Sequence, residues 1–170
     1  SILFYFTHQE QNDVIIRKKE IYDGATPSGN AVMGENLYQL SIIFDKADWR
    51  SRADKMLEIL SPSVIKYPGS FGKWATLLLQ QLNGRIEIAV VGSNFEPVSN
   101  NLLLNFIPNM MLMASEAENK AFPLLANKPQ NNLTLIYLCK NYTCLAPFSN
   151  THSLLQKMNK TNIRKKLKRI

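Results

Sequence analysis

Two cysteines five positions apart, Cys139 and Cys144, are the residues of this chain best suited to redox chemistry. On one uninterrupted strand, side chains five apart point to opposite faces of the sheet, so the two sulfurs would not meet. If residues 140–143 form a four-residue hairpin loop instead, the cysteines become cross-strand neighbours and the geometry permits a disulfide. Lys140 beside Cys139 would favour a thiolate slightly.

Three interpretations of this pair stay open on the residues alone: buried reduced thiols, a switchable redox pair, or part of a metal site. A zinc site needs four ligands, and the sequence supplies neither further cysteines nor a nearby histidine pair. We therefore expect no metal and no other cofactor.

A second group of polar residues occupies the segment RKKEIYDGATPSGN, residues 17–30, just before an expected helix. A glycine-rich turn that directs backbone N–H groups from a helix start can hold an anion. The segment matches neither the phosphate-loop pattern nor the dinucleotide fingerprint. The alternative is an elaborate turn in which Asp23 and Ser28 satisfy backbone groups.

Acid–base chemistry has few candidates in this sequence. Glycoside hydrolysis uses two carboxylates held about 5 to 10 Å apart, and neither Glu20 nor Glu35 has a spacing that defines a pair with Asp23. Histidines often carry protons in catalysis, but His8 and His152 are expected at the surface or at a helix cap. The chain is therefore expected to hold no complete active site.

Helices are expected to position the polar loop, between residues 30 and 82. Apolar residues recur there at three- and four-residue steps, which is typical of helices with one buried face. Ser28 or Asn30 could cap the first helix, Asp48 begins the second, and Pro62 limits it. The expected buried stripes are Val32, Met33, Leu37, Leu40 and Phe44; Ala53, Met56, Leu57 and Leu60; and Phe71, Trp74, Leu78 and Leu82.

After Gly84 the pattern changes to short strands, and IEIAVV at 86–91 is typical of a buried strand. Further strands are expected at 110–114, 133–139 and 143–147, with a right-handed crossover between the first two. Helices are expected after residue 94, at 118–126 and from Thr151 onward. Their expected inward residues are Leu102, Leu103 and Phe106 in the first and Leu154, Leu155, Met158 and Ile163 in the last.

These patterns predict an α+β fold with three parts: a helical-hairpin segment at 1–84, a small α/β lobe at 85–150, and a basic carboxy-terminal helix at 151–170. The opening SILFYFT already looks like a strand, so we expect the carboxy-terminal part of a longer protein.

The net charge of +7 is concentrated in the tail, where Arg164, Lys165, Lys166, Lys168 and Arg169 supply five charges. A groove that follows phosphates would need a basic body, so no specific nucleic-acid partner is expected. The tail is either a solvated helix end or a weak contact for polyanions or a membrane surface. No apolar run approaches the roughly 18 to 20 residues that cross a bilayer, and we expect a cytoplasmic protein without a membrane span.

Two ordered matches relate the chain to a known family. KEIYDGATPSGNAVMGENLYQL resembles a hallmark of the thioredoxin-domain-containing family that includes the spermatogenesis-associated thioredoxin-like proteins: an arginine, then D-G-A-x-P-S-G-N, then a helix with Asn-Leu. Here these are Arg17, residues 23–30, Asn36 and Leu37. IYLCKNYTCLAP is similar to the family's Tyr-x-Cys-x-x-x-x-Cys-x-x-Pro ending, and the resemblance covers roughly residues 1 to 150.

The resemblance implies a parent with a thioredoxin-like domain, an (α/α)6 toroid and a small α/β segment. The toroid would be similar to those of N-acylglucosamine 2-epimerases and six-hairpin glycosidases, whose cavity binds sugars. The loop would border that cavity, which makes Arg17, Asp23, Ser28 and Asn30 candidate pocket residues for a carbohydrate. The thioredoxin-like domain and most toroid helices are absent from this chain and are its expected partners.

The leading hypothesis is a noncatalytic fragment of a carbohydrate-binding or carbohydrate-processing parent, although likeness of fold says little about reaction. The alternatives are a redox-linked interaction module that uses Cys139 and Cys144, and plain structural closure of the toroid.

Overall fold

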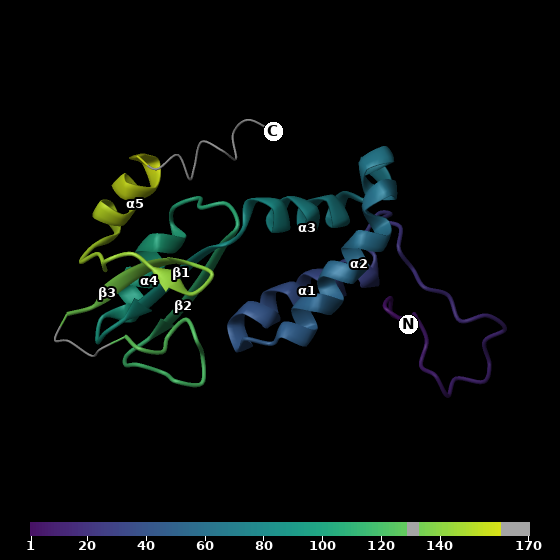
Figure 1. Cartoon of the computed structure of the whole chain (residues 1–170), viewed down its shortest axis with the longest axis horizontal. Coiled ribbons are helices and arrows are strands. Elements are labelled where there is room, and N and C mark those ends of the chain that lie inside the picture. Colours follow the sequence, from purple (N-terminus) through teal and green to yellow (C-terminus); the bar gives the residue numbers. More distant parts are fainter. Residues whose placement is uncertain (129–132, 161–170) are drawn as a thin grey trace. The chain divides into compact units, whose positions relative to one another are not determined.

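A computed structural model describes residues 1–128 and 133–160 of the chain (Figure 1). The chain divides into two compact units, Ser1–Asn83 and Gly84–Ile170. The first unit is helical and the second is built on a mixed four-stranded sheet, so the predicted α+β class is confirmed. The basic tail, including Ile163, lies outside the described residues.

The first unit is a helical hairpin followed by a third helix. Helix α1 (Gly29–Phe44) and helix α2 (Ala47–Lys66) are joined by two residues, and a 3-10 turn, η1 (Pro68–Ser70), leads to α3 (Gly72–Asn83). Asp45 ends α1 in the left-handed conformation and donates its N–H to the Ser41 carbonyl, which turns the chain back along α1 (Figure 1).

The opening segment SILFYFT, which looked like a strand, forms neither strand nor helix. Its backbone is held by a side chain instead: Phe4 donates its N–H to Asn30 Oδ1 at 2.7 Å, and the Phe4 carbonyl accepts from Asn30 Nδ2 at 2.9 Å. The strand prediction was wrong because an amide side chain, not a neighbouring strand, satisfies this backbone.

Helix α1 buries a different stripe from the expected one. Ala31, Gly34, Tyr38 and Ile42 face the core, whereas Val32, Met33, Leu40 and Phe44 are 37–41% exposed. The physical reason is close packing at Gly34. A Cβ there would lie 3.2 Å from a Leu77 methyl and 3.4 Å from the Trp74 ring, so the small residue lets α3 approach the helix.

Helix α2 buries the expected Ala53, Met56, Leu57 and Leu60, but it continues through Pro62 to Lys66. Proline removes one intrahelical hydrogen bond, and the burial of Val64 in the next turn offsets that cost. In α3 the expected Leu82 is 74% exposed and Leu77 is buried instead. Leu82 is eight residues beyond Trp74, which rotates it about 80° from the buried side.

The second unit is a sheet with strand order β2-β1-β3-β4. Strand β1 (Ile86–Val91) runs parallel to β2 (Met110–Ser115) and antiparallel to β3 (Leu135–Lys140), which forms a hairpin with β4 (Thr143–Cys144). Helix α4 (Phe95–Leu103) provides the crossover between the parallel strands. All four strands occur where the sequence placed them: β1 has the expected ends, and the ends of the other three are shifted.

Two apolar layers cover the sheet of this unit. On one face α4 and α5 (Thr151–Lys160) pack over Ile86, Ile88, Val90, Ile136 and Leu138. On the other face the segment 116–128 contributes Leu124 and Leu125, which pack against Ala89, Val91, Tyr137 and Cys139. Because both faces are covered, every residue of β1 is buried.

The expectations for residues 118–126 and for the end of α4 were wrong. Residues 118–126 form turns rather than a helix, since Pro123 has no N–H and local bonds such as Leu125 N–H to the Phe122 carbonyl close the backbone instead. Leu103 and Phe106 are 60% and 86% exposed, while Leu102 and Ile107 are buried. Helix α4 ends at Leu103, so the helical period no longer applies to the residues after it.

Gly92 is the residue that allows the chain to leave β1. Its φ of 141° lies in a region that glycine alone adopts readily, and a Cβ would lie 2.5 Å from Thr134 Cα and 2.9 Å from the Leu133 carbonyl oxygen. Both neighbouring atoms belong to the backbone of the segment entering β3, so they cannot rotate away.

Replacement of Gly92 by alanine is expected to lower the free energy of unfolding by about 2 to 4 kcal/mol, from backbone strain and the backbone clash. Urea denaturation of the whole chain measures this. The matched control is Gly24→Ala, where a Cβ meets nothing within 4 Å, and the change should stay within about 0.5 kcal/mol. Equal effects of the two substitutions would contradict the assignment.

Candidate redox site

Asp23 closes the polar loop of the first unit and caps α3. Its Oδ1 accepts the Ser28 N–H at 2.8 Å, and its Oδ2 accepts the Lys73 N–H at 2.7 Å. Lys73 is in the first turn of α3, where backbone N–H groups lack intrahelical partners. Both carboxylate oxygens therefore serve the chain's own backbone.

Ser28 and Asn30 act in the same way at the start of α1. Ser28 Oγ accepts the Ala31 N–H at 3.3 Å as an N-cap. Asn30 donates to the Glu20 carbonyl at 2.7 Å in addition to its two bonds with Phe4. Both side chains are buried, as the interpretation of this loop as an elaborate turn requires.

Arg17 is placed in the amino-terminal segment. One guanidinium nitrogen donates to the Thr7 carbonyl at 3.0 Å, and the guanidinium carbon lies 4.1 Å from the centre of the Tyr5 ring. The four candidate pocket residues thus contact the chain itself. Their place at the border of a sugar cavity stays a prediction.

The structure places three further acid–base candidates, Glu35, His8 and His152. Glu35 forms an ion pair with Lys73 and accepts from Gln80 Nε2 at 2.9 Å, which ties α1 to α3. His8 and His152 are exposed. Among the described residues, no three His, Cys, Asp or Glu side chains gather as a metal ion would require.

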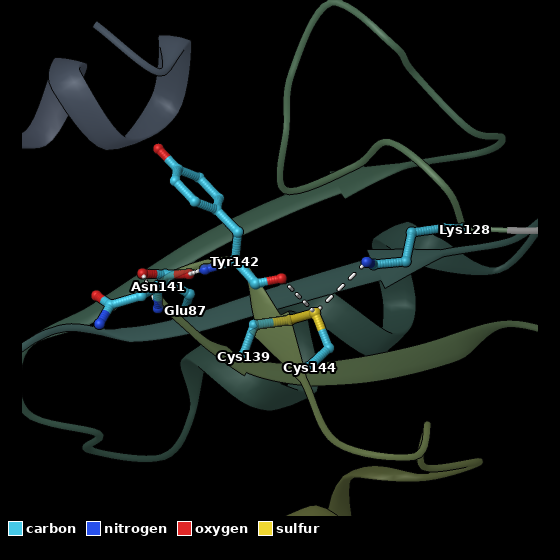
Figure 2. Close-up of a disulfide and its surroundings, with 6 residues drawn as sticks. All are labelled: Glu87, Lys128, Cys139, Asn141, Tyr142 and Cys144. Atoms are coloured by element: carbon cyan, nitrogen blue, oxygen red, sulfur yellow. Dashed lines mark hydrogen bonds between the residues drawn. A yellow bond between two sulfur atoms is a disulfide. The ribbon is translucent and has the colours of Figure 1, made fainter. Parts of the chain in front are cut away.

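Cys139 and Cys144 are joined by a disulfide across the β3–β4 hairpin (Figure 2). The two residues are register partners, and Lys140 pairs with Thr143 as the last step of the ladder. The loop is therefore two residues long, not four as expected. Asn141 and Tyr142 form it with φ angles of 49° and 61°, the left-handed pair that a type I′ hairpin turn needs.

Glu87 holds this turn from the centre of the sheet. It is only 3% exposed and extends from β1, with Oε1 accepting the Asn141 N–H and Oε2 accepting the Tyr142 N–H, each at 3.1 Å. Hydrogen bonds to an ionised acceptor are about twice as strong as neutral ones. They offset the strain of a tyrosine at positive φ, and they give a buried charge the partners it needs.

Lys128 lies on the other side of the disulfide (Figure 2). Its side chain is buried, its Nζ donates to Cys144 Sγ at 3.4 Å, and the same nitrogen is 4.9 Å from the centre of the Tyr137 ring. Desolvation lowers the pKa of Lys128, because burial disfavours its charged form. Within residues 1–128 and 133–160, Lys128 forms no ion pair with a carboxylate.

The two sulfurs differ in access. Cys139 is 3% exposed and packs in the core beneath the segment 116–128, whereas Cys144, on the edge strand β4, is half-buried. Thr143 beside it is exposed, and Leu145 is 47% exposed. A second molecule can therefore approach Cys144 far more easily than Cys139.

Sequence reasoning found the cysteines but missed both charged residues beside them. Lys140, the lysine that the sequence suggested, is exposed and its Cε lies close to Gly84. Lys128 is 16 residues before Cys144, in a segment without regular structure, and no local pattern marks it. Glu87 did leave a signal, since it is the single charged residue within the apolar run IEIAVV.

Replacing Asp23 by asparagine is expected to lower the free energy of unfolding by about 1 to 2 kcal/mol, because an amide cannot accept both backbone N–H groups. Thermal or urea unfolding measures the loss. Asp13→Asn removes the same charge at an exposed position and should change stability by less than about 0.5 kcal/mol. A neutral result for Asp23→Asn would refute its capping role.

Replacing Glu87 by glutamine is expected to lower the free energy of unfolding by about 1 to 3 kcal/mol, because one turn N–H then faces an amide donor instead of a carboxylate oxygen. Amide hydrogen exchange at Asn141 and Tyr142 should become faster, which locates the effect in the hairpin. The control Glu116→Gln changes an exposed carboxylate just after β2. If exchange at the turn were the same in both variants, Glu87 would not be holding it.

None of the described helices combines the length and the apolar character that crossing a bilayer demands. No family model matches the chain, and no solved structure matches it. The chain does share sequence similarity with known proteins.

The chain is 24% identical over 157 residues to spermatogenesis-associated protein 20 of Rattus norvegicus, which covers 85% of the chain and 20% of that relative. The human protein of the same name is 24% identical over 144 residues, 79% of the chain and 18% of the relative. An uncharacterized protein of Caenorhabditis elegans is 23% identical over 164 residues, 92% of the chain and 22% of the relative. The chain thus spans about a fifth of the length of curated relatives to which it is distantly similar.

Proposed function

We propose that the Cys139–Cys144 disulfide is a reversible redox pair that exchanges electrons with a dithiol partner. The observation that supports this function is the position of the bridge: it connects neighbouring strands at the sheet edge, with one sulfur half-buried and the other in the core.

A purely stabilising role is poorly suited to this bridge. In the chain-entropy account, a disulfide stabilises by restricting the unfolded chain, and a loop of five or six residues gains only about 2 kcal/mol, compared with about 4.7 for a hundred residues. The turn and the Glu87 carboxylate already hold the two cysteines in register. The bond can therefore open without requiring the hairpin to come apart.

The net reaction transfers two electrons. A reduced dithiol gives two electrons and two protons to the Cys139–Cys144 bond, which becomes two thiols, while the donor closes its own disulfide. A dithiol is the co-reactant class because its second sulfur releases the mixed disulfide within one molecule. In the longer parent that the resemblance implies, a thioredoxin-like domain would be such a donor.

This function is preferred to carbohydrate binding at residues 17–30. The polar atoms of Asp23, Ser28 and Asn30 are engaged with backbone groups, whereas the disulfide presents a reactive bond near the surface.

The experiment is a redox titration of the whole chain. The chain is equilibrated in reduced and oxidised dithiothreitol, and free thiols are counted after maleimide labelling. We expect half-reduction between about −200 and −280 mV, the range of exchange-active dithiols. A chain with both cysteines replaced by serine is the control and takes no label. A bond that stays closed below about −300 mV would behave as a structural disulfide, and the proposal would fail.

A further inference from the structure

We infer that Cys144 is the sulfur through which exchange proceeds, that Lys128 stabilises its thiolate, and that Cys139 is the resolving thiol. This assignment rests on the proposed redox function and adds the order of the steps and the residue that makes them favourable.

Access fixes which sulfur meets the partner. Thiol–disulfide exchange requires the attacking sulfur, the attacked sulfur and the leaving sulfur to approach one line, so a buried sulfur is a poor target. Cys139 is 3% exposed, with its partner strands on both sides and core side chains above it. Cys144 is half-buried on the edge strand. The donor thiolate therefore attacks Cys144 Sγ.

The bond changes then follow in two steps. Attack on Cys144 breaks the Cys139–Cys144 bond, and the electron pair goes to Cys139 Sγ, which takes up a proton. In the second step the donor's other thiolate attacks the donor sulfur of the mixed disulfide. Cys144 leaves as a thiolate, and the donor is oxidised to its own disulfide.

Lys128 is placed to receive that leaving charge. Its Nζ is already 3.4 Å from Cys144 Sγ while the sulfur is neutral. A cation within about 4 to 6 Å of an ionisable group favours its negative form by one to three units of pH. The carbonyl oxygen of Tyr142 lies 3.8 Å from the same sulfur and can accept a thiol S–H when Cys144 is protonated.

The burial of Lys128 gives the reduced state an additional advantage. In the disulfide form the contacts of the ammonium with the described residues are a neutral sulfur and the ring of Tyr137, and an unpaired buried charge is costly. Reduction supplies a thiolate as its counter-ion. Burial also raises the pKa of Tyr137, so its phenol stays neutral and does not act as a counter-ion for Lys128.

Glu87 has the opposite effect on the other sulfur. It faces Cys139 as a register partner on β1, and a neighbouring negative charge disfavours a thiolate. Lys128 and Glu87 lie on opposite sides of the bridge (Figure 2). The two charges therefore separate the roles: Cys144 ionises first, and Cys139 stays protonated until it resolves a mixed disulfide.

The test measures the ionisation of each thiol in the reduced whole chain. The chain is treated with iodoacetamide over a series of pH values, and trypsin cleavage after Lys140 separates the Cys139 peptide from the Cys144 peptide for mass spectrometry. The pH of half-maximal alkylation should be lower for Cys144 than for Cys139. Lys128→Met should raise the Cys144 value by about one pH unit or more and leave the Cys139 value unchanged.

Two further variants separate charge from packing. Lys128→Arg keeps the charge, so the pH of half-maximal alkylation of Cys144 should stay low. Lys120→Met removes an exposed lysine from the same segment and should change neither thiol. Circular dichroism establishes whether each variant is folded. If Lys128→Met does not fold, Lys128→Arg still tests the assignment.

The outcomes distinguish this inference from the proposed function. The assignment of Lys128 is overturned if Lys128→Met leaves the pH of half-maximal alkylation of Cys144 unchanged, or shifts it equally for both cysteines. This holds even if the disulfide titrates reversibly. If the assignment holds, the equilibrium with dithiothreitol should shift about tenfold toward the disulfide in Lys128→Met, or about 30 mV for two electrons. A bond that dithiothreitol cannot reduce would refute the proposed function itself.

Discussion

A carboxylate buried in an apolar strand must find hydrogen-bond donors, and Glu87 finds them in the two backbone N–H groups of the β3–β4 turn. This single arrangement determines much of the second unit. It fixes a two-residue turn that would otherwise be strained at Tyr142, and the turn fixes the register that brings Cys139 opposite Cys144. The disulfide is then a consequence of a ladder that the carboxylate has already organised.

The first unit follows the same rule with a different set of residues. Asp23, Ser28 and Asn30 use their polar atoms to satisfy backbone groups at helix starts and in the extended amino-terminal segment. These bonds cross long stretches of sequence, since Asp23 reaches Lys73 and Asn30 reaches Phe4. The segment before α1, which has no regular structure, thereby joins α1 to α3.

Much of the fold could be predicted from the sequence, because strands and helices leave periodic signals. The run IEIAVV and the stripe of α2 were correct for that reason. The buried face of α1 could not be read from apolarity, since it depends on Gly34 allowing α3 to pack closely. Only part of the candidate site could be predicted from the sequence. The cysteines share one hairpin, whereas Lys128 and Glu87 reach it through tertiary contacts that no local pattern encodes.

The burial of Trp74 has a consequence for optical work on this molecule. Trp74 is 0% exposed and donates its indole N–H to the Ile21 carbonyl at 2.9 Å. The chain's other tryptophan, Trp49, also precedes Gly84, and the sequence from Gly84 onward contains none. Intrinsic indole emission therefore reports on the helical unit alone. The tryptophan emission and a tyrosine or peptide signal can be followed in the same thermal unfolding experiment. If the two signals change at different temperatures, the two units melt separately.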